Sequence, residues 1–449
     1  MLPENVLLEI FDLYRKSHGY HRHRAWKWRL LTHVCRRWRQ VVLASPLRLN
    51  LRILCTRRSP IKKQLRIWQV LPIVLYLSGK GVRPNVEDDA VAVFEHPDRV
   101  CDVMLVVPGP RLERLAKLMQ RPFPLLTHLF ISPGVGNAPT LPRGFLGGSA
   151  PSLQQIILNR VPYPSLPTLL LWTSDLIELH LLNIPPTGYI SPEAMVVVLA
   201  ALPRLQYFFM DFQSASFRPD EIHPPPATRT VLPSLIWLKF KGASEYLEGL
   251  VAQIDSPQLE WICINYFNQL ADFQASQLSR FIDRSVGPQA TLFKRAKISF
   301  SRREVSFTMS PHAKHEGPVS ITIICEGIDW QVSHMTHLLS QFAVTLSNLV
   351  HLNLTNLGKL EGQLEGMDDV EWRDLLHPFS TTRALHASRK LAGHISPALE
   401  DITGEMVLPS LDSIRLVGQP ASSGKKLLAR RQHPVTVVDG FFAEVPVYV

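Results

Sequence analysis

One short apolar pattern recurs along this chain and constrains its fold more than any other feature. The unit reads Pro-x-Leu-x-x-Leu-x-Leu with apolar substitutions, as at 151–158, where Leu153, Ile156 and Leu158 follow Pro151. Six copies begin at Leu126, Leu153, Leu176, Leu205, Leu235 and Leu259, which are 27, 23, 29, 30 and 24 residues apart. Two later copies begin at Leu349 and Leu411.

This period falls in or next to the 20–29 residues of leucine-rich repeats. Alternate apolar residues of each short strand face the core, and the proline is tolerated at the leading edge because no ladder donor is lost there. Helical patterns lie between the strands, at 191–202, 245–254, 277–285 and 334–346. We therefore predict an α/β protein, a leucine-rich-repeat-like solenoid with a parallel curved sheet, over residues 47–449.

Some parts of the chain depart from the repeat. Matches fail at about 290–330, although 298–300 and 320–324 still alternate like strands, and they weaken at 360–405. Leu47, Leu49, Leu51 and Ile53 alternate with polar residues and predict the first strand. The loop with three prolines at 224–226 is interpreted as an exposed spacer or a binding loop. We expect a C-terminal cap at about 420–449, with a basic amphipathic tail at 422–431.

The first 46 residues have helical rather than strand periodicity. Leu2-Pro3-Glu4 is typical of a helix start, because proline fits the first turn and an acid favours the positive end of the helix dipole. One apolar stripe is Leu7, Ile10, Phe11 and Tyr14, and a second is Leu31, Val34, Cys35, Trp38 and Val42. Ser45-Pro46 ends the second pattern. Helices this short bury little alone, so they must dock on the rest of the chain or on a partner.

Positive charge is concentrated at this end of the chain. Residues 1–70 hold 16 Lys or Arg and three acidic residues, a balance of +13, against +10 for all 449 residues. The other residues therefore sum to about −3. A local basic patch favours nucleic acid, an anionic membrane or an acidic protein as partner. The aromatic residues nearby, Trp26, Trp28 and Trp38, have helical spacing, which favours a protein.

The two ends of this helical segment resemble a known family motif. Leu-Pro-Glu-Asn-Val-Leu-Leu-Glu-Ile-Phe at 2–11 and Val-Cys-Arg-Arg-Trp-Arg at 34–39 strongly resemble the F-box. In that family the apolar positions bind the Skp-type adaptor of cullin–RING ubiquitin ligases. The resemblance implies adaptor contacts by Leu2, Pro3, Leu7, Ile10, Phe11, Val34, Cys35 and Trp38. The connection between the two ends, with His18, His21 and His23, is longer than the common pattern.

An F-box at 1–46 followed by leucine-rich repeats resembles a large family of fungal F-box proteins. Further stretches similar to that family are 44–49, 71–73, 246–248, 267–270 and 376–379. The resemblance implies the substrate-recognition subunit of an SCF-type ligase, with ubiquitin transfer left to the RING partner and the conjugating enzyme. A protein substrate is expected on the variable strand positions, at His180, Tyr207, Trp237, Lys239 and Trp261.

The sequence offers no pattern that predicts an enzyme. It contains no P-loop, G-x-S-x-G, H-E-x-x-H or G-x-G-x-x-G. His334 and His337 are three apart, but two imidazoles without a third ligand are interpreted as surface residues, and Cys35 as a packed or interface thiol. The acidic cluster of Asp368, Asp369 and Glu371 is interpreted as a helix start. We expect no catalytic residue, cofactor or metal.

Cysteine usage and hydropathy indicate the compartment. The five cysteines are scattered and form no C-x-x-C pair, which favours a reducing environment. The apolar runs are short for a bilayer, and the first residues do not resemble a signal peptide. A cytoplasmic or nuclear protein with no membrane partner is predicted.

Two other functions stay open at the level of sequence. The first is a leucine-rich-repeat scaffold whose F-box never joins a ligase. The second is a basic protein that binds nucleic acid or an anionic surface through its N-terminal residues. The second predicts binding that falls steeply with salt, and the first predicts no adaptor binding.

Overall fold

The computed structural model describes most of the chain, in two compact units. The described residues are 2–16, 28–45, 48–49, 51–56, 61–78, 86–134, 136, 138–214, 228–267, 273–285, 293–311, 318–356, 369–399, 407–417 and 436–440. Unit 1 comprises Met1–Ile190 and Ala201–Leu205, and unit 2 comprises Ser191–Ala200 and Gln206–Val449. The proline loop at 224–226 and the tail at 422–431 lie outside the described residues. The predicted division at residue 46 falls inside unit 1.

Unit 1 begins with three helices, α1 (Glu4–Lys16), α2 (Trp28–Thr32) and α3 (Arg36–Ala44). The predicted helix start is confirmed, since the amide of Leu7 donates to the carbonyl of Pro3 at 3.1 Å, and α3 ends just before Ser45. The spacing of the second apolar stripe predicted one helix, but the structure divides this stripe between α2 and α3. Cys35 breaks it, because its backbone is extended and its Sγ accepts a hydrogen bond from the amide of Trp38 at 3.4 Å, which caps α3.

Six parallel strands follow in chain order in unit 1. They are β1 (Ile53–Thr56), β2 (Ile73–Ser78), β3 (Val100–Val107), β4 (His128–Pro133), β5 (Gln155–Asn159) and β6 (Glu178–Ile184). The helical elements between them are α4 (Ile61–Ile67), α5 (Val86–Phe94), α6 (Gly109–Leu118), η2 (Phe145–Gly148) and α7 (Leu166–Leu170), and η3 (Pro186–Gly188) follows β6. The strand predicted from Leu47 begins only at Ile53. The amide of Leu49 still donates to the carbonyl of Ser45 at 3.1 Å, so the chain turns there after α3.

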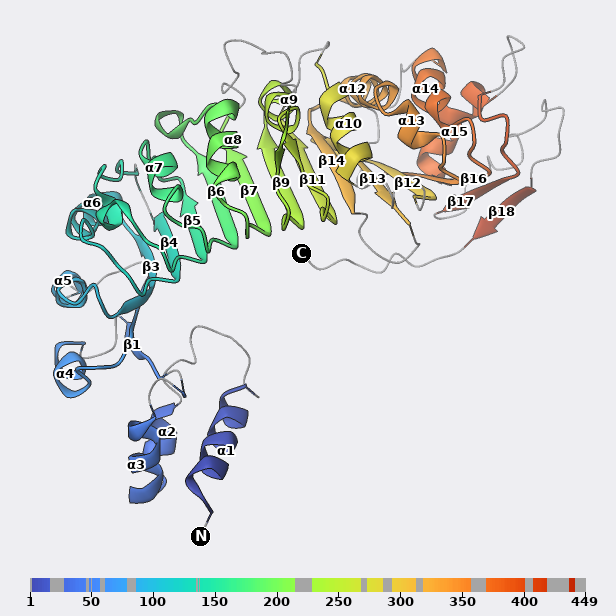
Figure 1. Cartoon of the computed structure of the whole chain (residues 1–449). Helices are drawn as coiled ribbons and strands as arrows, with labels where there is room; N and C mark the ends of the chain where they lie inside the picture. The colour runs from blue at the N-terminus through green and yellow to red at the C-terminus, as the bar shows by residue number, and fades with distance from the viewer. Residues whose placement is uncertain are drawn as a thin grey trace. The chain divides into compact units, whose positions relative to one another are not determined.

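The repeat pattern fills the core of unit 1 as predicted. Leu129, Ile156 and Leu179 are register partners on β4, β5 and β6, and all three are buried. The first leucines of these copies are also buried, beneath the strands that they precede. Alternate residues of each strand therefore form a core face, and the residues between them form an open face. Helices lie along one side of the strands (Figure 1).

Unit 2 contains ten strands of the main sheet. In spatial order they are β7 (Tyr207–Phe212), β9 (Trp237–Gly242), β11 (Trp261–Tyr266), β14 (Val319–Ile324), β13 (Glu304–Ser310), β12 (Arg295–Phe300), β15 (His351–Asn356), β16 (Ala384–Ser388), β17 (Ser413–Val417) and β18 (Thr436–Gly440). The short strands β8 (Thr230–Val231) and β10 (Ile254–Asp255) form a separate parallel pair. The helical elements are α8 (Pro192–Ala200), α9 (Ser244–Val251), α10 (Ser276–Ser285), α12 (Ile328–Ser340), α13 (Ala343–Leu346), α14 (Asp369–Leu376), η4 (His377–Phe379) and α15 (Arg389–Leu399).

One strand of unit 2 runs against its neighbours. β13 is antiparallel to both β12 and β14, while β12 pairs with β15 and β14 pairs with β11 in parallel. This is the stretch at 290–330 where the repeat matches fail. The two strands expected there are confirmed within β12 and β14, and β13 was not predicted. The fold of this chain is thus a mostly parallel leucine-rich-repeat-like solenoid of the α/β class, with N-terminal helices.

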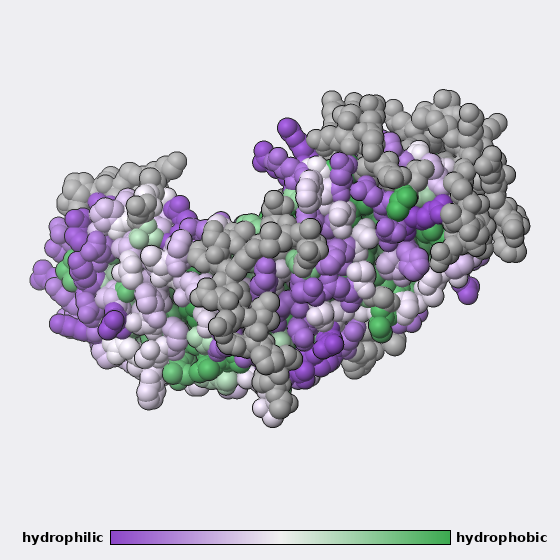
Figure 2. Space-filling model, turned by 90° about the horizontal axis from the view of Figure 1, so that it is seen from above, coloured by the Kyte–Doolittle hydropathy of each residue, from purple (hydrophilic) through white to green (hydrophobic). Residues whose placement is uncertain are grey.

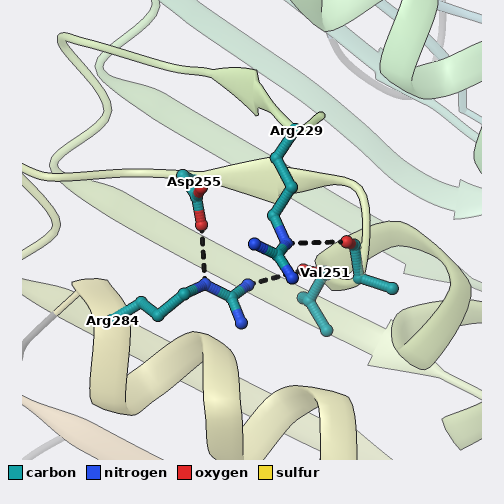
Figure 3. Close-up of polar contacts among 5 residues, drawn as sticks. Arg229, Val251, Asp255 and Arg284 are labelled. Atoms are coloured by element: carbon teal, nitrogen blue, oxygen red, sulfur yellow. Dashed lines mark hydrogen bonds and ion pairs between the residues drawn. The ribbon is translucent and has the colours of Figure 1, made fainter. Parts of the chain in front are cut away.

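Polar contacts join neighbouring helices of unit 2 on the side away from the open face. Both Glu248 carboxylate oxygens of α9 accept hydrogen bonds at 2.8 Å from amides at the start of α10, those of Gln277 and Leu278. At the other end of α9, Arg229 and Arg284 donate to the carbonyls of Ala252 and Val251, and Arg284 also pairs with Asp255 at 2.7 Å (Figure 3). These cations satisfy carbonyls left open at the negative end of α9.

Across the described residues, we find no helix with the length and apolar character that a membrane span requires.

Candidate functional site

The N-terminal helices present an apolar surface on the side away from their own core. Within α1, Leu7 and Phe11 are buried, so the predicted single stripe with Ile10 is divided between two faces. Ile10 is 38% exposed and Val34 is 59% exposed, and Leu2, Pro3 and Cys35 are exposed as well. Five of the eight predicted adaptor contacts are therefore accessible in this structure.

Three further apolar residues of these helices are exposed and were not predicted. Val6 and Leu13 share the exposed face of α1 with Ile10, at helical spacings of four and three residues, and Leu30 is exposed on α2. Their signal was available in the sequence, because Val6, Ile10 and Leu13 form a second apolar stripe beside that of Leu7, Phe11 and Tyr14. We call Leu2, Val6, Ile10, Leu13, Leu30 and Val34 the N-terminal apolar surface.

Contacts between α1 and α3 hold this surface in place. The rings of Phe11 and Trp38 meet edge to face, with centroids 4.8 Å apart. The Arg37 guanidinium donates to the Leu2 carbonyl at 2.5 Å, which brings the start of α1 beside the start of α3. Arg48 pairs with Glu9 at 2.6 Å, but both side chains are exposed, so this pair adds little stability.

The helical segment is attached to the first repeat of unit 1 through a buried tryptophan. Indole Nε1 of Trp28 donates to the carbonyl of Arg52 at 2.9 Å, and its ring meets that of Trp68 edge to face at 5.3 Å. We expected these helices to dock on the rest of the chain or on a partner, and the structure shows the first of these through Trp28.

The open face of unit 2 carries an aromatic row, formed by Tyr207, Trp237 and Trp261. These three residues are register partners on β7, β9 and β11. Trp237 lies 6.4 Å from Tyr207 and 5.9 Å from Trp261 between ring centroids. Trp237 is exposed, and the other two are half-buried. The structure therefore brings together three of the five predicted substrate residues.

A second row lies beside the aromatic row. Lys239 is the register partner of Phe209 and Cys263, and its Nζ lies 5.9 Å from the centroid of the Phe209 ring. Next along the strands, Lys241 pairs with Asp211 at 3.4 Å. Burial raises the pKa of Asp211 above its usual range, although Lys241 opposes this shift. Lys239, a predicted substrate residue, is thus adjacent to the aromatic row.

The fifth predicted substrate residue, His180, belongs to unit 1. It lies on the open face of β6, where its Nε2 is 3.8 Å from a carboxylate oxygen of Glu178. Glu178 also accepts a hydrogen bond from the Gln155 side chain on β5.

The two histidines considered as metal ligands, His334 and His337, pack against other parts of the chain. We expected His334 to be a surface residue, and this was wrong. Its side chain is 2% exposed and lies between the rings of Phe273 and Trp330. The Nε2 atom of His337 is 2.6 Å from the Phe273 carbonyl. No cluster of three or more His, Cys, Asp or Glu with metal-binding geometry occurs among the described residues.

The view in Figure 2 shows hydrophilic residues over most of the described surface, with apolar residues in small separate groups.

The fold and its surfaces define a leucine-rich-repeat-like solenoid. No protein-family model matches the sequence, and no curated protein matches it. Among solved structures, a crystal structure of a TLR13–ssRNA13 complex matches with a TM-score of 0.31 and 13% sequence identity. That match covers 82% of this chain and 42% of the TLR13 chain, so this chain spans less than half the length of that protein.

Proposed function

We propose that this chain is the substrate-recognition subunit of an SCF-type cullin–RING ubiquitin ligase. The N-terminal helices would bind a Skp-type adaptor, and the open face of the repeats would bind a protein target. The observation that carries the proposal is the N-terminal apolar surface. Its residues Leu2, Ile10 and Val34 combine exposure with the F-box-like sequence at 2–11 and 34–39.

The physical basis is the energy available from such a surface. A few desolvated apolar side chains supply most of the binding energy of an interface, while charged residues around them speed the encounter. Arg36 and Arg37 lie beside Val34 and Cys35, so an acidic adaptor surface would suit this site. The proposal gives the chain no reaction of its own and places it in the cytoplasm or nucleus.

The test is co-purification of the full chain with a co-expressed Skp-type adaptor. We compare the wild type with Ile10→Gln/Val34→Gln, which removes two exposed apolar side chains, one on α1 and one in the turn between α2 and α3, and places a helix-compatible residue in α1. The matched control is Val91→Gln/Leu118→Gln, because these side chains are exposed to 37% and 40% on two other helices of unit 1.

We expect the first double variant to lose at least about 30-fold in adaptor affinity, a change of about 2 kcal/mol, with its melting temperature unchanged. The control should bind like the wild type. Phe11→Ala, which empties a buried position, should lower both folding of the helical segment and binding. No adaptor complex with a folded wild-type chain would reject the proposal and leave the scaffold function.

A further inference from the structure

The open face of unit 2 changes character between β11 and β12. The strands β14 and β13 present the hydroxyl side chains Ser320, Thr322, Ser306, Thr308 and Ser310. Beyond them, β12, β15, β16 and β17 present Arg295, Lys297, His351, Asn353, His386 and Arg415. We call these last six residues the basic row set.

The basic row set is continuous across neighbouring strands. Lys297, Asn353, His386 and Arg415 are successive register partners, and Arg295 is the register partner of His351 two residues earlier along the strands. Neighbouring strands are about 4.8 Å apart, so the four partners span about 14 Å. All six side chains are half-buried, which places them against the sheet surface rather than extended into solvent.

No acidic side chain balances this charge at those open positions of β12, β15, β16 and β17 whose side chains the structure describes. The nearest strand carries one, Glu304, but it begins β13 while Arg295 pairs with Ser310 at that strand's far end. Asp412 precedes β17 on the alternation of the core face, and its amide donates to the carbonyl of Arg383 at the start of β16. Among the residues that the structure describes on these four strands, the uncompensated charge of the open face is therefore positive.

Burial and the neighbouring positive charges lower the pKa values of the two histidines, His351 and His386. Burial first, and then the positive charges of Arg415 and Arg295 together with His351, lower the pKa of His386 below its usual range. Burial and Arg295 likewise lower the pKa of His351. The charged groups that act on His386 are thus Arg415 on β17, His351 on β15 and Arg295 on β12. Lys297 on β12 lies in the same register row as His386. A bound anion would relieve the repulsion among them.

We propose that the basic row set binds the carboxylates of an extended acidic peptide segment in a protein target. In an extended chain, alternate side chains lie about 7 Å apart on one face, so two or three alternate carboxylates match a row about 14 Å long. The serine and threonine side chains on the open face of β13 and β14 offer uncharged hydrogen-bond partners for the peptide backbone. Three permanent cations on this row set are few for a nucleic-acid site, which uses many phosphate contacts.

The aromatic row adds a second specificity. β11 and β12 are three strand spacings apart, about 14 Å, which about four extended residues would span. The target segment would therefore carry an apolar residue, about four polar residues and then alternating acids. This inference rests on the substrate-receptor function proposed above and names the class of its substrate.

The test is fluorescence anisotropy with a labelled peptide Leu-Ser-Thr-Ser-Thr-Glu-Thr-Glu-Thr-Glu and the purified full chain. The same peptide with glutamines in place of the glutamates is the ligand control. The variant is Lys297→Gln/Arg415→Gln, and its matched control is Lys62→Gln/Lys63→Gln, which removes two exposed cations from α4 of unit 1. Melting temperatures and adaptor co-purification are measured for every variant.

We expect the glutamate peptide to bind at least about tenfold more tightly than the glutamine peptide. We also expect Lys297→Gln/Arg415→Gln to abolish that difference, while the Lys62/Lys63 control retains it and all variants still bind the adaptor. Equal binding of the two peptides, or equal loss in the control variant, would overturn the inference. Tighter binding of a dodecamer of deoxythymidine than of the peptide would reassign the face to nucleic acid. Loss of adaptor binding alone would count against the ligase function and not against the peptide site.

Discussion

On the open-face alternation of the unit 1 sheet, Glu178 is half-buried and Asp102 is buried, and strands β1–β6 themselves contain no lysine or arginine. The corresponding positions of unit 2 present five cations, Lys239, Lys241, Arg295, Lys297 and Arg415, and the two acids Asp211 and Glu304. Both units obey the same apolar pattern on the core face. The repeat therefore fixes packing and leaves the open face free to differ in chemistry.

We expect the largest effect on stability from a substitution on the core face of β7 in unit 2, compared with one on the open face of the same strand. Phe212 of β7 is fully buried against Phe240 and Tyr246, with ring centroids 6.1 and 4.9 Å away. We expect Phe212→Ala to lower the free energy of unfolding by about 3–5 kcal/mol in urea denaturation. Phe209→Ala, on the open face of the same strand, should cost about 1 kcal/mol or less. Equal losses would contradict the division into two faces.

In unit 1, we expect substitutions in one turn, as well as substitutions in the core, to lower stability. Gly147 has φ +65°, and a Cβ there would lie 2.6 Å from the backbone nitrogen of Pro122. We expect Gly147→Ala to destabilise unit 1 by about 2–3 kcal/mol, because backbone must move. Gly148→Ala is the control, since it shares a positive φ of +74° but would meet no atom within 4 Å. Its cost should be about 1 kcal/mol, and thermal melting of both variants checks the difference.

A third prediction concerns the buried carboxylate that joins α9 to α10 in unit 2. Glu248→Ala should cost about 2 kcal/mol, because two helix-start amides lose their acceptor. Burial raises the pKa of Glu248 above 4.5 in the folded chain, despite the amides of Gln277 and Leu278. Its contribution to stability is therefore complete below pH 4.5 and is lost as pH rises through the folded pKa. Glu248→Gln, which does not titrate, should flatten that dependence in urea unfolding, and an unchanged slope would contradict the assignment.

The smallest effect should come from the histidines of the basic row set. Because the folded pKa of His386 is below 6.5, its contribution to stability is present above pH 6.5 and is lost as pH falls through the folded value. His386→Gln should make this acid-side loss shallower, by less than about 1 kcal/mol since the group is half-exposed. Asn353→Gln changes the same row without a titratable group and should leave the slope unchanged.

The sequence predicts the core far better than the open face. The inward positions repeat because each must fill the same space, so Leu235, Leu238 and Phe240 reveal a strand by themselves. The pattern is hidden where other residues fill that space. At β16 the first position is Thr382, a buried polar residue in place of leucine, so the strand was missed.

The candidate sites are harder to predict from the sequence, because they depend on how α1 packs on α3 and on which distant strands pair. Periodicity placed Ile10 with Phe11, but only the packing of α1 on α3 decides that Phe11 is inside and Ile10 outside. The basic row set joins residues from 295 to 415 through strand order. The antiparallel β13 changes that order, and no local pattern in the sequence indicates it.

The strand order around β13 also has a consequence during synthesis on the ribosome. Strands β7, β9 and β11 can pair one after another as they leave the tunnel, but the next strand made, β12, occupies a place three positions away. The edge of β11 stays unpaired until β14 at 319–324 has emerged, and β13 then joins the two halves. An unpaired strand edge invites pairing with other chains. While residues 267–324 are being made, the β11 edge of the nascent chain is therefore open to pairing with other chains.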